Sequence, residues 1–245
     1  MFDRRVNAFV FFNAFLFNAT FSDGVTTEIE VNPEFGTAAA AQVEAEKYGS
    51  AIGQLPRALR TNVQSVWIHR GVELFGGGNN SILIHTGQAD LYTADGFLEE
   101  ALVHEGTHTS VDPTNAATPG WLAAQAADAD FISTYAMDFP DRDDVAESFL
   151  PYLALRYRQD RIPASLAAAI AMTIPNRIAY FDAQSFDVSP ITAGPAAVPE
   201  PGTLTLVLGG SAVGVVWGMR RRNWGHQSPR TGRHLARTTR VPTSG

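Results

Sequence analysis

Two histidines four residues apart, His104 and His108, restrict what this chain can fold into more than any other feature of its sequence. They flank Glu105 in the pattern H-E-x-x-H. On an α-helix, residues four apart differ by about 40° in azimuth, so both imidazoles project from one face. That spacing suits two nitrogens on one zinc ion, and Glu105 is placed to take a proton from a zinc-held water. The sequence therefore predicts a helix that carries two metal ligands and a general base.

The absence of cysteine narrows the set of other ligands. Without Cys, neither a disulfide framework nor a thiolate metal site can form, so any metal must be held by His, Asp or Glu. The chain has six histidines, and two of them, His226 and His234, lie in its basic C-terminal region. Zinc needs a third protein ligand and an open position for water. Since the chain has no cysteine and few histidines, we expect that third ligand to be acidic.

An acidic cluster supplies the candidates for the third ligand: Asp141, Asp143, Asp144 and Glu147. We expect Asp141 to be the N-cap of a helix over residues 143–157. Asp143 and Glu147 are four apart and share a face, so one could bind metal while the other braces a histidine. Asp144 is expected to point elsewhere. The residues alone leave the third ligand open between Asp143 and Glu147.

The N-terminal region has two interpretations. Residues 15–31 alternate between apolar and polar side chains through a turn at residues 22–24, which predicts a β-hairpin. The apolar stretch at residues 8–21, which follows two arginines, instead resembles a signal peptide. Asn13 and Asn18 interrupt that stretch, so the hairpin is favoured, and the export signal would then lie upstream of this start.

Other elements follow from periodicity and from glycine and proline. Short strands are expected at residues 65–69 and 81–85, and the glycines between them predict a flexible loop. Residues 112–120 are expected to form a connector that contains proline. Further helices are expected at residues 37–60 with a break at Pro56, from Asp95 through the H-E-x-x-H, at residues 121–130 and at residues 164–172.

Charge and hydropathy divide the chain near residue 202. Residues 1–202 carry 25 acidic and 11 basic side chains, a formal charge of −14, which argues against nucleic acid as a partner. An apolar stretch at residues 203–219 then precedes three arginines, as in a short transmembrane segment with a positive-inside anchor. Residues 220–245 are basic and expected to be disordered.

This part of the chain resembles the PEP-CTERM sorting signal, because a V-P-E-P at residues 198–201 is followed by the apolar stretch and then by the arginine cluster. The resemblance implies export in a Gram-negative bacterium, recognition by an exosortase-type enzyme, and a location in the cell envelope or outside the cell. It differs from that family in continuing beyond the arginines to residue 245. A plain membrane anchor at residues 203–219 is the alternative.

Three short motifs are similar to those of gluzincin-type metallopeptidases of the anthrax-lethal-factor kind. They are the H-E-G-T-H, the Y-A-x-D at residues 135–138 and the D-D-V-A-E-S-F at residues 143–149. The resemblance implies that Tyr135 stabilises the transition state, that Asp143 stands at the ligand glutamate, and that Glu147 is the second acidic residue. The ligand position is Asp rather than Glu, and one extra residue separates it from Tyr135. Residues 14–190 also resemble an uncharacterised secreted family.

These observations together predict an α+β, zincin-like fold over residues 1–190, with a small mixed sheet packed on active-site helices and a linker at residues 191–202. We expect the strand at residues 81–85 to be the sheet edge near the active-site helix, where an extended peptide could pair. The expected activity is zinc-dependent peptide hydrolysis, with Glu105 and Tyr135 as catalytic residues. The alternatives are a catalytically inactive zincin-fold protein of the surface or exopolysaccharide matrix, and processing of itself or of one partner.

Other polar residues have structural interpretations. His69 and His85 alternate with apolar neighbours and are expected to be packed or edge histidines rather than ligands. Asp112 either orients His108 or caps the turn at Pro113, and capping is the favoured interpretation. Several aromatic residues are expected to line the core or a groove: Trp121, Phe131, Phe149, Tyr152 and Tyr157.

Overall fold

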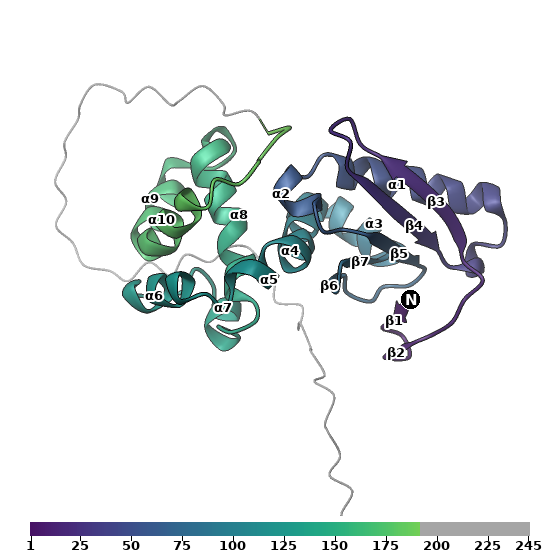
Figure 1. Ribbon diagram of the computed structural model, residues 1–245, viewed down its shortest axis with the longest axis horizontal. Helices are drawn as coiled ribbons and strands as arrows, with labels where there is room; N and C mark the ends of the chain where they lie inside the picture. The colour runs from purple at the N-terminus through teal and green to yellow at the C-terminus, as the bar shows by residue number, and fades with distance from the viewer. Residues whose placement is uncertain (192–245) are drawn as a thin grey trace, which may run out of the picture. The chain divides into compact units, whose positions relative to one another are not determined.

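The structure is a computed structural model that describes residues 1–191 (Figure 1). These residues form the expected α+β fold, and the larger of its two sheets has five strands. Among them, no helix has both the length and the apolar character needed to cross a bilayer. The expected V-P-E-P motif, transmembrane segment and basic tail, together with nearly all of the expected linker, lie outside the described residues.

The sheet has the strand order β3-β4-β5-β7-β6. Strands β3 (Phe15–Thr20) and β4 (Thr26–Val31) pair antiparallel, which confirms the expected hairpin. Strand β5 (Ser65–His69) runs parallel to β4 and to β7 (Ser81–His85). Strand β6 (Gly76–Gly78) pairs antiparallel with β7 and ends the sheet. The sheet is therefore mixed, and both strands expected between residues 65 and 85 have the predicted bounds.

The glycine run corrects two expectations, because it is a strand rather than a flexible loop and it replaces residues 81–85 as the edge of the sheet. Asn79 and Asn80 have φ angles of 50° and 58°, which suits a two-residue hairpin turn between β6 and β7. A Cβ atom on Gly77 would lie 2.1 Å from the backbone oxygen of Glu105. Only glycine therefore allows β6 to approach the H-E-x-x-H helix so closely.

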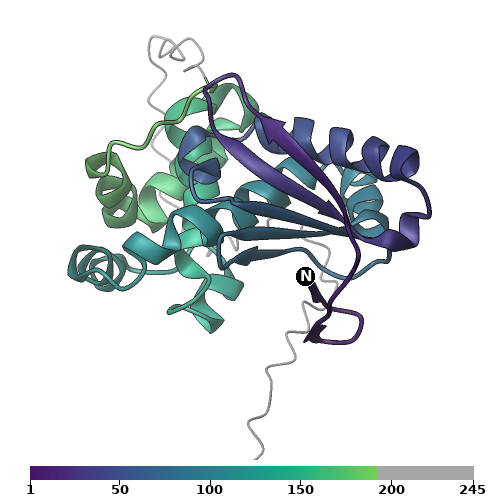
Figure 2. The same ribbon diagram turned by 45° about the vertical axis from the view of Figure 1, so that its right-hand side comes forward.

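Helices α1 (Ala38–Gly53), α3 (Thr86–Ala94) and α4 (Leu98–Ser110) pack on the sheet. Helix α1 packs against β3 and β4, as Figure 2 shows, and α4 packs against β6 and β7. The sheet contributes buried apolar side chains to the core: Ile29, Val31, Val66, Ile68, Ile82 and Ile84. Burial of this apolar surface is the main force that holds α4 in place.

A short N-terminal segment packs against side chains of β5. Strands β1 (Phe2–Asp3) and β2 (Ala8–Phe9) pair with each other. The ring of Phe9 lies 6.1 Å from that of Trp67, and the ring of Phe12 lies 5.7 Å from that of His69. This segment helps to bury the part of β5 that holds His69.

The second half of the described chain is helical. Helix α8 (Asp144–Tyr157) packs against α4 and against the smaller helices around it. The other short helices are η1 (Pro33–Phe35), α2 (Arg57–Arg60), α5 (Asp112–Asn115), α6 (Pro119–Ala127), α7 (Thr134–Asp138), η2 (Gln159–Arg161), α9 (Ala164–Thr173) and α10 (Pro175–Ala183). Because α4 contacts the sheet on one side and α8 on another, its histidines can meet residues of the helical half.

Several helix ends differ from their expected positions. Helix α4 begins at Leu98 rather than at Asp95, which is the C-cap of α3. Helix α8 begins at Asp144, with Asp143 in the cap position and no side-chain capping bond. Residues 112–120, expected as a connector, contain α5. The core contains three of the expected aromatic residues, which are almost fully buried: Trp121, Phe149 and Tyr152.

Candidate metal centre

Three side chains from α4 and the start of α8 converge on one point. The Nε2 atoms of His104 and His108 lie 3.0 Å apart. Asp143 Oδ1 lies 3.3 Å from His108 Nε2 and 3.9 Å from His104 Nε2. Ligand atoms around a tetrahedral zinc, at the usual bond lengths, are separated by roughly 3.3–3.6 Å. The His-His-Asp group could therefore hold a metal ion, and its donor atoms are of the kind that zinc accepts.

A carboxylate contacts the Nδ1 atom of each imidazole. His108 Nδ1 lies 2.5 Å from Asp112 Oδ2, and His104 Nδ1 lies 3.3 Å from Glu147 Oε1. A proton held on Nδ1 by a carboxylate leaves the Nε2 lone pair free to bind a cation. The favoured interpretation of Asp112 as a turn cap was wrong, because its carboxylate contacts the imidazole.

The two candidates for the third ligand occupy different places. Asp143 Oδ1 lies among the Nε2 atoms, whereas Glu147 faces the Nδ1 side of His104. Glu147 is fixed there by Ser133, whose hydroxyl donates a 2.6 Å hydrogen bond to Oε2. Ser133 also caps α7, because its Oγ accepts from the backbone of Ala136. The geometry therefore favours Asp143 as the ligand and Glu147 as the residue that orients His104.

A buried ion pair anchors the start of α8. Asp144 Oδ2 accepts hydrogen bonds from Arg177 Nε at 2.8 Å and from Gln125 Nε2 at 2.9 Å. The Arg177 guanidinium also donates to Asp128 at 3.0 Å, and its side chain is fully buried. Asp144 therefore points away from the histidines, as expected, while Asp143 points toward them. The sequence offered no signal for Arg177, because nothing marks it as buried.

The electrostatics of the centre favour positive charge. Burial alone would lower the pKa of His108, but its contacts with Asp112 and Asp143 raise it to about 10. Burial would raise the pKa of Asp143, but His108 and Arg142 lower it overall. In the absence of a cation, a proton on His108 supplies the charge that the carboxylates require, so a metal ion would replace that proton.

Glu105 and Tyr135, the expected catalytic residues, lie near this group. Glu105 is 4% exposed and acts electrostatically on His108. Burial raises the pKa of the Tyr135 hydroxyl to about 12, and the charge on Asp143 acts in the same direction. The hydroxyl therefore keeps its proton at neutral pH and can serve as a hydrogen-bond donor.

The other two described histidines form a separate buried pair. His69 and His85 face each other across β5 and β7, with ring centroids 5.4 Å apart, and both are fully buried. Burial lowers the pKa of each of them. They are packed histidines, as expected, and the candidate metal group does not include them.

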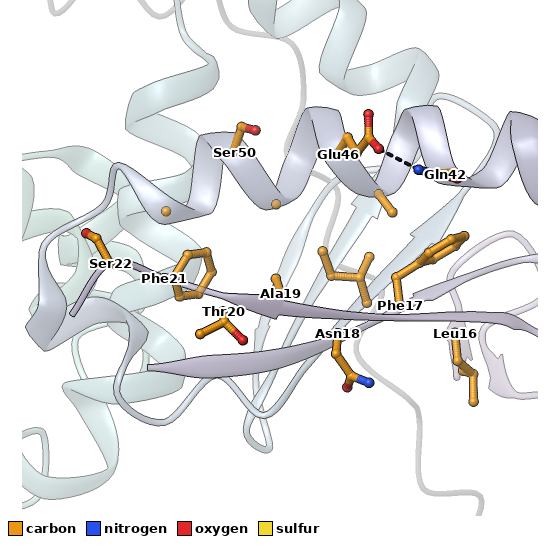
Figure 3. Close-up of a pocket in the computed structure, with 14 residues that line it drawn as sticks. Leu16, Phe17, Asn18, Ala19, Thr20, Phe21, Ser22, Gln42, Glu46 and Ser50 are labelled. Carbon is orange, nitrogen blue, oxygen red and sulfur yellow. Dashed lines mark hydrogen bonds between the residues drawn. The ribbon is translucent and has the colours of Figure 1, made fainter. Parts of the chain in front are cut away.

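A groove of about 730 Å³ lies between β3 and α1 (Figure 3). Phe17 lines it from β3 and Phe21 from the position just after that strand, and Glu46 and Ser50 line it from α1. Its lining residues do not include any member of the metal centre. The groove is therefore a separate feature from the candidate site.

Comparisons with known proteins do not assign this centre to a family. No family model, curated protein or solved structure matches the chain. The similarity of its short motifs to gluzincin-type peptidases and to the PEP-CTERM signal therefore stays a prediction.

Proposed function

We propose that this protein hydrolyses peptide bonds with a zinc ion held by His104, His108 and Asp143 in a zincin-like fold. The convergence of two Nε2 atoms and one carboxylate oxygen on a single point is the observation that carries the proposal. Zinc, when bound, would polarise the scissile carbonyl and lower the pKa of the attacking water.

The chain's own residues supply the remaining chemistry. Glu105 follows His104 directly on α4, and its carboxylate would accept the proton of the attacking water and return it to the leaving amine. Tyr135, protonated at neutral pH, would donate a hydrogen bond to the oxyanion that forms at the carbonyl. Asp112 and Glu147 would keep the imidazoles oriented through their Nδ1 atoms.

The edge strand offers a place for the substrate backbone. Strand β6 ends the sheet and touches α4 at Glu105 through Gly77. Its residues are all glycine, so the strand adds no side chains of its own beside an incoming peptide, and the Arg4 side chain lies next to Gly76. An extended peptide could add to this edge by backbone hydrogen bonds, which would bring its carbonyl groups close to the metal centre.

The sequence supports a location for this activity. The similarity of residues 198–222 to a PEP-CTERM signal supports a peptidase of the cell envelope or cell surface, sorted by an exosortase-type enzyme and held in the membrane by residues 203–219. The negative charge of the body argues against nucleic acid as a partner. An inactive surface protein with the same fold is the alternative, and an intact Glu105 disfavours it.

A peptide-library digest tests the proposal. The purified full chain loaded with zinc should cleave peptides, and a chelator should abolish the cleavage. Glu105→Gln should retain zinc but lose activity by at least about 100-fold, as expected for a lost general base. Glu99→Gln, an exposed change on the same helix, is the matched control and should leave the rate unchanged. Cleavage that survives in Glu105→Gln would rule out the proposed mechanism.

A further inference from the structure

Arg142 contacts Oδ2 of Asp143, whereas Oδ1 of the same carboxylate contacts the histidines. Its Nε donates a 2.8 Å hydrogen bond to Asp143 Oδ2, while Asp143 Oδ1 lies 3.3 Å from His108 Nε2. The Arg142 side chain is 46% exposed, and that of Asp143 is only 4% exposed. The two oxygens of one buried carboxylate therefore have separate partners, a guanidinium and the metal centre.

The guanidinium is itself held in place by its neighbours. Its central carbon lies 4.5 Å from the centre of the Phe139 ring, and that ring lies 5.0 Å from the ring of Tyr135. The backbone N–H groups of Arg142 and Asp143 both donate to the carbonyl oxygen of Phe139, at 3.1 and 2.9 Å. Arg142, Phe139 and Tyr135 thus form one packed unit beside the centre.

We propose that Arg142 is a positioning residue that restricts Asp143 to a single ligating oxygen, Oδ1. A carboxylate can bind a metal ion through one oxygen or through both. A charge-assisted hydrogen bond to Oδ2 makes the second mode costly, because the guanidinium would lose its partner. Single-oxygen binding by Asp143 leaves a coordination position open for water, which a catalytic zinc site requires.

Lysine could not replace Arg142 in this role. The planar guanidinium lies over Phe139 and at the same time donates from Nε to Asp143. A lysine ammonium is a point charge on a flexible stem and cannot combine stacking with donation in a fixed plane. The role of Arg142 therefore requires the planar shape of its side chain as well as its charge.

Cobalt(II) binding to the full chain tests this role without any measurement of activity. Cobalt in a four-coordinate site absorbs visible light much more strongly than cobalt with more ligands, so its spectrum reports how Asp143 binds. We expect Arg142→Ala to weaken cobalt binding by about tenfold, because the Asp143 carboxylate loses the partner that orients it. The visible absorption should also fall, because Asp143 becomes free to bind through both oxygens. Arg142→Lys should show the same lowered absorption.

The matched control is Arg158→Ala, which removes a partly exposed arginine paired with Asp160. It should bind cobalt as the unchanged protein does. If Arg142→Ala misfolds, as circular dichroism would reveal, Arg142→Lys still provides the spectrum. Affinity and absorption equal to those of the unchanged protein in the folded variants would overturn the inference.

The inference rests on the proposed metal centre, but the two fail in different ways. A chain that binds cobalt with the expected effect of Arg142→Ala, yet cleaves no peptide when loaded with zinc, would refute the proposed function alone. A chain that cleaves peptides while Arg142→Ala and Arg142→Lys keep the cobalt spectrum unchanged would refute the role of Arg142 alone.

Discussion

The carboxylate of Asp112 lies one helical turn beyond His108 and contacts its Nδ1 atom, with 2.5 Å between Oδ2 and the nitrogen. A single short segment of chain thus supplies both a candidate metal ligand and the group that orients it. His104 obtains its orienting carboxylate, Glu147, from α8 instead. The orientation of His104 therefore depends on how α8 packs against α4, whereas that of His108 depends on a residue four positions along the chain.

Removal of the Asp112 carboxylate should weaken metal binding. We expect Asp112→Ala to reduce zinc affinity by about 10- to 100-fold, because His108 loses the partner that fixes its ring and its Nδ1 proton. Competition with a chromophoric chelator measures this change. Asp95→Asn, at the exposed end of α3, is the control. An affinity that is unchanged in Asp112→Ala would show that the contact has no role in binding.

Gly77→Ala should destabilise the fold, because the new Cβ would overlap the Glu105 carbonyl oxygen, which cannot move without α4. We expect a loss of more than about 2 kcal/mol in the free energy of unfolding, as for other forced overpacking. Gly76→Ala in the same strand is the matched control, since its Cβ would meet only the flexible end of Arg4. Equal stabilities of the two variants in urea unfolding would contradict the close packing of β6 on α4.

The buried ion pair of Arg177 should matter far more than an exposed pair. Arg177→Ala leaves Asp144 and Asp128 charged and buried, so we expect a loss of about 3–5 kcal/mol in unfolding free energy. Arg156→Ala, which breaks a half-exposed pair with Asp182, should cost no more than about 1 kcal/mol. Chemical denaturation measures both, and similar losses would show that the Arg177 pair does not anchor α8.

Stability should fall at mildly acidic pH because of His69. Burial, together with the neighbouring His85, lowers the pKa of His69 from 6.5 to about 4, although Asp3 and Glu34 act in the opposite direction. Between these values the unfolded chain binds the proton and the folded chain does not. The contribution of His69 to stability is therefore complete above about pH 6.5 and is lost toward pH 4, by at most about 1.4 kcal/mol per pH unit.

His69→Asn checks this dependence, since its amide keeps a polar partner for Asn32, which contacts His69 Nδ1 at 2.8 Å. Urea unfolding at several values between pH 4 and 7 should show a shallower loss of stability in the variant. A residual slope is expected, because burial also lowers the pKa of His85. An identical slope in both proteins would show that His69 does not titrate in this window.

The sequence predicted the elements with clear side-chain periodicity and missed those without it. Strands β5 and β7 and the β3–β4 hairpin follow from β-branched residues and alternation. Strand β6 has no side chains to form a pattern, and only its Asn-Asn turn could have revealed it. Helices α3 and α10 were not anticipated, because each is only nine residues long.

The candidate site was predictable where its chemistry is local. His104, Glu105 and His108 lie within one turn of one helix, so their spacing alone brings them together. The choice between Asp143 and Glu147 depends on how α8 meets α4, which tertiary packing decides. Arg142 and Ser133 matter only through contacts with those carboxylates, so no sequence pattern could single them out.

The zinc content of the purified full chain tests the central claim most directly. After dialysis that removes loosely held metal, elemental analysis should find one zinc per chain in the unchanged protein and almost none in His108→Ala or Asp143→Ala. Glu99→Gln should retain the full amount. A folded, unchanged protein that holds no zinc after incubation with the metal would contradict the account.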